Sequence, residues 1–360
     1  MPHNTPTMDS RKEIEMHSFK TAALLGALFV TNLGAGFAQA QQDTTLNLYT
    51  SRHYQSDDTL YENFTKATGI RVNVVSGKED ELIQRIRREG RASPADVFIT
   101  VDAANLQAAD EAGLFETVRS KTIESRIPAQ FRGEENRWFG FSYRARVIAY
   151  NKDRVKAEDV QNYADLANPR FKGKVCVRSG GHVYNRTLMA SMIYNQGDEK
   201  AMDWARGIVA NLARDPKGGD TDQIRAVAAG ECDVAISNHY YYARLMASSK
   251  PEDQTVVNRV GLVFPDQKGK GTHVNVSGGG MLKHARNKEA ATRFLEYLTS
   301  DEAQAYFANG NNEWPVVASV RLNNPQLDAL GRFKVDNISA GILAQYTPKA
   351  QRFIDRAGWK

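Results

Sequence analysis

The chain alternates between two hydrophobic periods in the region that begins near residue 45. Short runs with apolar residues at every second position are followed by stretches with apolar residues three and four positions apart. The first pattern indicates a strand and the second an amphipathic helix. We expect strands at 46–50, 70–75 and 96–100, and helices at 57–68, 78–90 and 103–112. Such regular alternation is typical of a parallel, doubly wound α/β sheet.

A long extended segment, 138–151, separates this unit from a second alternating unit, and its length suits a crossing between two lobes. A further apolar segment, 274–282, is the expected return crossing. The second unit is expected to contain strands at 174–177, 232–237 and 260–264, a helix through Leu188, Met192 and Tyr194, another helix at 201–212, and the segment 222–229. Helices at 288–299 and 301–309 would follow, and the tail, 323–360, predicts polar helices packed outside the core.

Three consecutive tyrosines, Tyr240, Tyr241 and Tyr242, stand at the end of the strand predicted at 232–237. We expect the next helix to start at Ala243, which leaves Tyr240 and Tyr241 in an irregular turn. Open α/β sheets bind ligands outside the carboxyl ends of their strands, so both phenols could face one cleft. Phenolate oxygens suit a hard, highly charged cation such as ferric iron. The alternative is that these rings pack a lobe surface with hydrated hydroxyls.

The N-terminus has the pattern of a secretory signal peptide over residues 1–40. Lys20 precedes an apolar run at 21–30, and small residues lead to an A-x-A cleavage pattern that ends at Ala40. A membrane anchor is the poorer interpretation because a spanning helix needs roughly 20 apolar residues. Residues 1–15 are polar and form an upstream extension if Met16 is the true start. Export would place the mature protein in the periplasm.

Composition and cysteine usage fit an exported globular protein. The 360 residues are 41% hydrophobic and 25% charged, which allows two lobes. The net charge of +5 is spread without a long basic run, so no nucleic-acid partner is expected. The two cysteines, Cys176 and Cys232, are expected to form a disulfide after export, with two buried free thiols as the alternative. No H-E-x-x-H, G-x-S-x-G or Walker motif occurs, so an enzyme is not expected.

Several separated segments match one family in the same order. They are Leu48-Tyr49-Thr50-Ser51-Arg52-His53-Tyr54, Pro94-Ala95-Asp96-Val97-Phe98, the segment 140–148, Tyr184-Asn185 and Asn238-His239-Tyr240-Tyr241. In these segments the chain resembles the ferric-iron-binding periplasmic proteins of ABC importers, and most nearly the cyanobacterial-type subgroup that binds iron chiefly through tyrosines. The resemblance implies a two-lobe type II periplasmic-binding-protein fold, with doubly wound sheets joined by two crossover segments. The implied parts are an N-lobe at 41–143 and 275–310, a C-lobe at 144–274, and a C-terminal helical segment at 311–360 packed on the lobes.

The resemblance also assigns roles at individual positions. It implies that the ligands to Fe(III) are the phenolates of Tyr54, Tyr184, Tyr240 and Tyr241. His53 matches a position that is a fifth ligand in some members and stays away from the metal in others. Arg144 matches an arginine near the cleft in that subgroup, where it would offset the phenolate charge. Arg244 is not assigned by the resemblance, but it lies one turn beyond the tyrosine pair and could either do the same or occupy a solvated helix face. His239 replaces a residue that is more usually threonine, and it could be a bystander, a hydrogen-bond donor near the ligands or an alternate ligand.

The function that the resemblance implies is the capture of Fe(III) between two lobes. The protein would be a monomer that delivers the ion to the membrane permease of an ABC importer. The competing interpretation is a binding protein for an organic cation or anion, such as a polyamine or a phosphonate, with the tyrosines forming an aromatic cage. Such cages more typically use several tryptophans, and all four tryptophans lie outside the proposed loops. We expect Tyr242 to pack rather than to bind.

Overall fold

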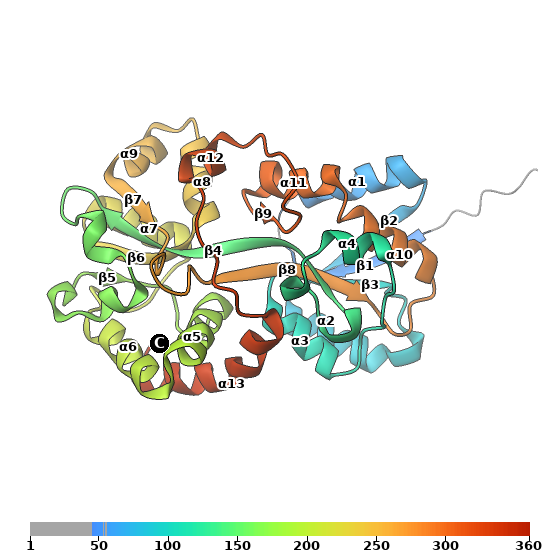
Figure 1. Ribbon diagram of the computed structural model, residues 1–360, viewed down its shortest axis with the longest axis horizontal. Helices are drawn as coiled ribbons and strands as arrows, with labels where there is room; N and C mark the ends of the chain where they lie inside the picture. The colour runs from blue at the N-terminus through green and yellow to red at the C-terminus, as the bar shows by residue number, and fades with distance from the viewer. Residues whose placement is uncertain (1–44, 53, 55) are drawn as a thin grey trace, which may run out of the picture. The chain divides into compact units, whose positions relative to one another are not determined.

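Two long antiparallel strands, β4 (Phe139–Asn151) and β8 (Val274–Met281), join two groups of shorter strands (Figure 1). The computed structural model describes residues 45–52, 54 and 56–360. The predicted signal peptide and His53 therefore lie outside the described residues. Within the described part, the sheet order is β2-β1-β3-β8-β4-β6-β5, and β7 and β9 also pair with β4. The shorter strands are β1 (Thr45–Thr50), β2 (Arg71–Ser76), β3 (Val97–Thr100), β5 (Val175–Cys176), β6 (Val234–Asn238), β7 (Val260–Val263) and β9 (Trp314–Pro315).

The sheet is mixed, whereas the strand and helix alternation alone predicts a parallel one. Strands β1, β2 and β3 are parallel to one another, and so are β5 and β6. Strand β8 is antiparallel to β3, and β4 is antiparallel to β8, β6 and β7. The antiparallel pairs arise because β4 and β8 run past each other in opposite directions as the chain crosses and returns. The two predicted crossover segments are thus confirmed.

The helices agree with the apolar periodicity over most of the chain. Helix α1 has the predicted bounds, buries Leu60 and Phe64, and ends at Gly69, whose φ of 76° favours glycine. The helices are α1 (Asp57–Thr68), α2 (Glu79–Glu89), α3 (Ala103–Glu111), α4 (Lys121–Arg126), α5 (Val183–Gln196), α6 (Asp198–Ala210), α7 (Asp220–Ala229), α8 (His239–Ala247), α9 (Pro251–Arg259), α10 (Lys288–Tyr297), α11 (Asp301–Asn311), α12 (Pro325–Leu330) and α13 (Ala340–Ala357). Helix α9, which begins at a proline, was not predicted.

Two other expectations about helices are wrong. Helix α8 begins at His239, four residues before the predicted start at Ala243, so Tyr240 and Tyr241 lie in a helical first turn. The tail is not a set of polar helices outside the core, because α13 buries Leu343, Phe353 and Ile354. These side chains join the hydrophobic cluster formed by α5 and α6.

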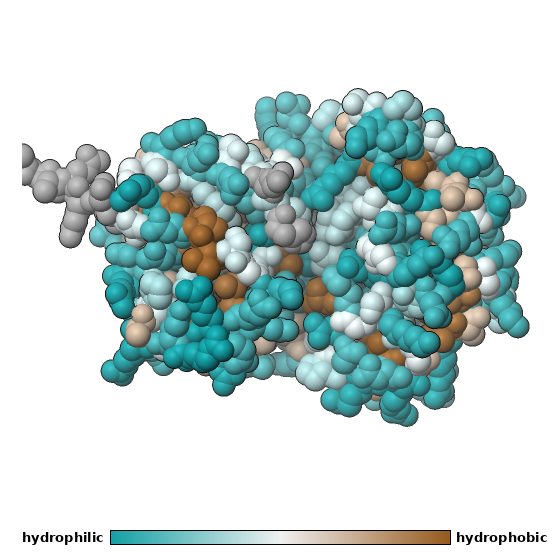
Figure 2. All heavy atoms as spheres, turned by 180° about the vertical axis from the view of Figure 1, so that it is seen from behind, coloured by the Kyte–Doolittle hydropathy of each residue, from teal (hydrophilic) through white to brown (hydrophobic). Residues whose placement is uncertain are grey.

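Apolar side chains lie mainly inside the molecule. One hydrophobic cluster surrounds β1, β3 and α10, and another surrounds β6, α5 and α6. Figure 2 shows hydrophilic residues over much of one face, with apolar residues in separate small areas. Among the described residues, the exposed large hydrophobic side chains are Val74 and Tyr194. No helix of the described residues is long and apolar enough to cross a membrane.

A disulfide joins Cys176 on β5 to Cys232, which lies two residues before β6. Both cysteines are buried, and their Cα atoms lie 5.8 Å apart. The bond closes a loop with a sequence separation of 56 residues. It therefore constrains the unfolded chain across the segment that contains α5, α6 and α7.

We expect the Cys176→Ala/Cys232→Ala variant to lose about 4 kcal/mol in free energy of unfolding, because its unfolded chain regains the entropy of an open loop. The measurement is urea unfolding with and without a thiol reductant. The reductant should lower the stability of the wild type and leave the variant unchanged. Equal stability of the wild type and the variant in the absence of reductant would contradict the expectation.

Candidate metal centre

Four tyrosines from three segments of the chain meet in the described structure. Tyr54 lies in the loop after β1, Tyr184 in the first turn of α5, and Tyr240 and Tyr241 in the first turn of α8. The strands β1 and β6 end just before two of these segments. This is the strand-end position at which α/β sheets form ligand sites.

The rings of these tyrosines lie close together. The hydroxyl oxygens of Tyr184 and Tyr240 are 3.0 Å apart. The ring centroids of Tyr54 and Tyr240 are 6.3 Å apart in an edge-on arrangement, and those of Tyr240 and Tyr241 are 4.3 Å apart. The structure therefore brings together all four tyrosines that the sequence singles out.

Backbone contacts at two helix N-termini set the directions of these tyrosines. The Nδ1 atom of His182, the N-cap of α5, accepts a hydrogen bond from the backbone N–H of Tyr184 at 3.3 Å. The backbone N–H of Asn238, which precedes α8, donates to Asp220 Oδ2 at 2.7 Å. These bonds satisfy groups at the two turns that a strand or helix ladder would leave unpaired.

Burial keeps the phenols protonated in the absence of a cation. Tyr54, Tyr184 and Tyr240 are 8%, 5% and 0% exposed. Burial raises the pKa of each of these phenols above the ordinary value of about 10, and at Tyr54 the neighbouring Glu313 carboxylate raises the pKa further. Ionisation therefore needs a strong positive charge at the oxygens, and a bound multivalent cation supplies one.

Arg144 provides a fixed positive charge beneath the tyrosines. Its guanidinium carbon lies 5.1 Å from the centroid of the Tyr184 ring, and the side chain is 1% exposed. Its Nη2 atom is 3.7 Å from Oδ2 of Asp102. Burial raises the pKa of Asp102 to about 6 even though Arg144 opposes that rise. The Nε and Nη2 atoms of Arg144 have no hydrogen-bond partner in the part of the chain that the structure describes. Much of the positive potential of this arginine is thus available to the tyrosine oxygens.

Two further arginines face the same ring and were not singled out from the sequence. The guanidinium carbons of Arg146 and Arg178 lie 5.7 Å and 5.2 Å from the Tyr184 centroid. Both are paired with the buried carboxylate of Asp220. This single carboxylate offsets one of their two positive charges, whereas Arg144 has only the 3.7 Å approach to Asp102.

Arg244 lies over three of the four rings from the exposed side. Its guanidinium carbon is 5.2 Å from the Tyr54 centroid, 5.0 Å from that of Tyr240 and 5.7 Å from that of Tyr241. The residue itself is exposed. Arg244 therefore lies on an exposed helix face and also adjoins the tyrosines.

His239 forms hydrogen bonds to the backbone through both ring nitrogens. Nδ1 accepts from the N–H of Ala145 at 3.2 Å, and Nε2 donates to the carbonyl of Asn312 at 2.6 Å. The ring is fully buried, and its centroid is 3.9 Å from that of Trp314. Neither nitrogen is left for a cation in this arrangement. His239 instead links β4 to the segment that follows α11.

Tyr242 is turned away from the other tyrosines. Its hydroxyl donates to the carbonyls of Val257 and Val260 at 3.2 Å and 2.7 Å. The ring belongs to the hydrophobic cluster that contains Val227 and Leu245. Packing rather than ligand binding is therefore its role in this structure.

A buried ionic group next to Tyr54 was missed by the sequence interpretation. Glu313 is fully buried and accepts a hydrogen bond from the Tyr54 hydroxyl at 3.3 Å. Burial would raise the pKa of this carboxyl, but Arg52 and Arg144 outweigh burial and hold the pKa below its ordinary range. The partners are 259 residues apart, and no local motif marks Glu313, so the sequence offered no signal for the contact.

Phenol oxygens are the metal donors that this site offers. The described residues contain no group of three or more His, Cys, Asp and Glu side chains that could hold a metal ion. A soft or borderline ion such as zinc, which prefers Cys and His, therefore fits poorly here.

A ligand site beside two strands that cross between groups of shorter strands fits the class of solute-binding proteins. Comparisons with known proteins identify the family to which the chain belongs. Residues 59–334 match the family model of bacterial extracellular solute-binding proteins. The chain is 47% identical over 315 residues to iron uptake protein A1 of Synechocystis, a match that covers 88% of this chain and 87% of the relative. It is also 47% identical over 344 residues to iron uptake protein A2 of Synechocystis, with 95% and 97% covered.

Solved structures agree with these relatives. A Trichodesmium IdiA (FutA) protein in complex with iron and citrate ligands has 52% identity and a TM-score of 0.84, covering 88% of this chain and all of that one. The chain belongs to the bacterial extracellular solute-binding proteins, and within them to the cyanobacterial-type ferric-binding group. The type II solute-binding fold expected from the resemblance is thus confirmed.

The buried histidines predict how stability depends on pH. Burial lowers the pKa of His239 and His273 to about 3 in the folded protein, against an ordinary value near 6.5. Between these values the unfolded chain binds protons that the folded chain does not, so stability falls as the pH is lowered through this range. Replacing His239 by Gln, whose amide can make both backbone hydrogen bonds, should flatten the dependence by about 1.4 kcal/mol per pH unit.

The measurement is urea unfolding of the metal-free protein at several values between pH 4 and pH 7.5. The matched control is His284→Gln, which replaces an exposed histidine and should keep the wild-type slope. A His239→Gln slope equal to that of the wild type would show that His239 does not contribute to the acid destabilisation.

Proposed function

We propose that this protein binds Fe(III) through the phenolates of Tyr54, Tyr184, Tyr240 and Tyr241 and delivers the ion to the membrane permease of an ABC importer. The observation that supports this most directly is the convergence of four phenol groups, with the Tyr184 and Tyr240 oxygens 3.0 Å apart. Residues 1–40 would act as a signal peptide, so that the mature protein works in the periplasm. The protein would return its cargo unchanged and would not be an enzyme.

Hard-ligand chemistry favours ferric iron over other ions. Ionised phenols are hard oxygen donors, and the raised pKa values of Tyr54, Tyr184 and Tyr240 mean that a highly charged ion is needed to displace their protons. Four phenolates and one Fe(III) would carry a net charge of −1, since the ion contributes three positive charges. Arg144 and Arg244, whose guanidinium carbons lie about 5 Å from the rings, would offset that charge.

The relatives support the same solute. The Synechocystis proteins are iron uptake proteins, and the Trichodesmium structure contains iron and citrate. More distant relatives at 26% and 27% identity are the Fe(3+)-binding periplasmic protein of Serratia marcescens and a major ferric iron-binding protein of Neisseria meningitidis. The identity of the solute in these proteins makes Fe(III) the first candidate for this chain.

Lobe closure would couple binding to transport. In the proposed division, 41–143 and 275–310 form the N-lobe, 144–274 form the C-lobe, and 311–360 pack on both. Tyr54 would then come from the N-lobe and the other three ligands from the C-lobe, with β4 and β8 as hinges. The ion would favour the closed form because all four oxygens reach it only there.

Titration of the mature, metal-stripped protein with ferric citrate should produce a visible phenolate-to-iron charge-transfer band that saturates near one equivalent. The Tyr240→Phe/Tyr241→Phe variant should lose most of this band because it lacks two donor oxygens. The matched control is Tyr242→Phe, which removes a neighbouring hydroxyl that bonds to backbone carbonyls, and it should keep the band. If the wild type gives no band but closes on a polyamine or a phosphonate, the ferric function fails and the aromatic-cage function takes its place.

Iron binding should release protons and tighten as the pH rises. Burial raises the pKa of Tyr54, Tyr184 and Tyr240, so these phenols are protonated near neutral pH and each phenolate formed from them frees one proton. The apparent affinity should therefore rise about tenfold per pH unit for every proton released. Competition against ferric nitrilotriacetate between pH 6 and pH 8, corrected for the protonation of the chelator, measures this slope. An affinity that is independent of pH would show that the ligands are not phenols.

A further inference from the structure

We propose that Glu313 is the positioning residue of Tyr54 and that it fixes this tyrosine to the two crossover strands. The inference rests on the proposed function, because the position of Tyr54 matters most if it is the ligand that the N-lobe contributes. Glu313 itself is not proposed as a metal ligand.

The Glu313 carboxylate is surrounded by side-chain donors. Oε1 accepts hydrogen bonds from the hydroxyls of Tyr54 and Ser277, both at 3.3 Å. Oε2 accepts from the Ser142 hydroxyl at 2.8 Å and lies 3.4 Å and 3.3 Å from Nη1 and Nη2 of Arg52. The residue is fully buried, so this arrangement excludes the water that could otherwise solvate the carboxylate.

The two serines connect Glu313 to the hinge. Ser142 lies on β4 and Ser277 on β8, and these residues are directly paired in the sheet. Glu313 itself immediately precedes β9, which pairs with β4 at Ser142 and Tyr143. The carboxylate is thus held at one point of the crossover by both strands, and it presents its Oε1 atom to Tyr54.

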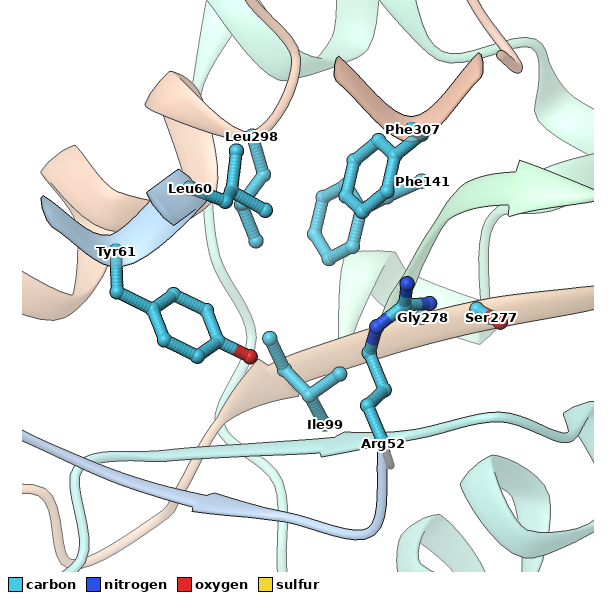
Figure 3. Close-up of a pocket in the computed structure, with 9 residues that line it drawn as sticks. All are labelled: Arg52, Leu60, Tyr61, Ile99, Phe141, Ser277, Gly278, Leu298 and Phe307. Atoms are coloured by element: carbon cyan, nitrogen blue, oxygen red, sulfur yellow. The ribbon is translucent and has the colours of Figure 1, made fainter. Parts of the chain in front are cut away.

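Arg52 holds the other side of the Tyr54 loop. Its Nε atom lies 2.6 Å from Oδ2 of Asp57, the first residue of α1, while the same guanidinium also reaches Glu313. The guanidinium carbon is 4.8 Å from the Tyr54 ring centroid. Figure 3 shows the Arg52 side chain beside a cavity of about 10 Å³. The loop is therefore tethered on both sides of Tyr54 by buried, paired charges.

This tether has a specific consequence for a site that closes between two lobes. Three of the proposed ligands lie on two neighbouring helix N-termini, and Tyr184 and Tyr240 already contact each other. Tyr54 lies on a separate loop, so its oxygen needs its own support to arrive in a productive position. Holding a ligand in its bound orientation beforehand lowers the entropy cost of binding.

The first test is the Glu313→Gln variant. Glutamine keeps the shape but has one acceptor oxygen, so it cannot serve Tyr54 and Arg52 at the same time. The Tyr54 phenolate of the ferric complex has no proton to donate, so this hydrogen bond holds Tyr54 only before iron binds. The rate of iron capture from ferric citrate should therefore fall about tenfold, the size of one hydrogen bond to a charged group. The charge-transfer band should shift toward that of Tyr54→Phe. In a Tyr54→Phe background, Glu313→Gln should add no further change, because a residue that acts through Tyr54 has nothing left to position.

The matched control is Asp96→Asn. Asp96 is a fully buried carboxylate that accepts from the backbone N–H groups of Asn47, Arg286 and Asn287, and it contacts no proposed ligand. This variant should lose stability while keeping the charge-transfer band and the rate of iron capture. Additive effects of Glu313→Gln and Tyr54→Phe would overturn the proposal, since they would show that Glu313 acts on the fold as a whole.

A metal-free measurement separates this inference from the proposed function. Nitration by tetranitromethane, read for each tyrosine by peptide mass spectrometry, should increase at Tyr54 in Glu313→Gln relative to Tyr184. Unchanged nitration of Tyr54 would overturn the positioning role. Increased nitration in a protein whose wild type gives no iron band would support the positioning role while the ferric function fails.

Discussion

The passage of β4 through both groups of strands is the constraint on which the site depends. Residues 139–145 of this strand pair with β8, and residues 146–150 pair with β6. The partner strand therefore changes between Arg144 and Arg146. Since residues two apart in a strand share a face, both guanidiniums are directed to the Tyr184 ring. The crossover that joins the lobes is thus also the element that places positive charge beneath the tyrosines.

The distribution of ion pairs around this crossover explains why one arginine differs from the others. A buried charge is costly unless it is paired and hydrogen-bonded. Arg146 meets this requirement through Asp220 and through Asn185 Oδ1 at 2.8 Å, and Arg52 meets it through Asp57 and Glu313. Arg144 has only the 3.7 Å approach to Asp102 and a long bond of 3.5 Å to Ser277. Its incomplete pairing costs stability, and a cluster of phenolates would recover part of that cost.

Local periodicity predicted α1 and the crossovers well, because each is decided by its own apolar pattern or by its length. The start of α8 was misplaced because His239, Tyr240 and Tyr241 are weak helix formers, whereas the strand end at Asn238 is fixed by the distant Asp220 carboxylate. The tyrosine set was found because its members follow strands or match a known family. Glu313 could not be found, since a contact across 259 residues depends on how the folded segments meet.

The arrangement of the tyrosines also implies an order of events if iron binds as proposed. Tyr184 and Tyr240 are already in contact, and Tyr241 is adjacent in the same helical turn, so three oxygens are available on one side before closure. Tyr54 comes from the other side of the crossover and is held by groups attached to β4 and β8. In the proposed closure, an ion that first meets the three-tyrosine side would gain its fourth oxygen only as the hinge strands bring Tyr54 into place. The hinge geometry, rather than the affinity of any one phenolate, would then decide when the cargo is fully enclosed.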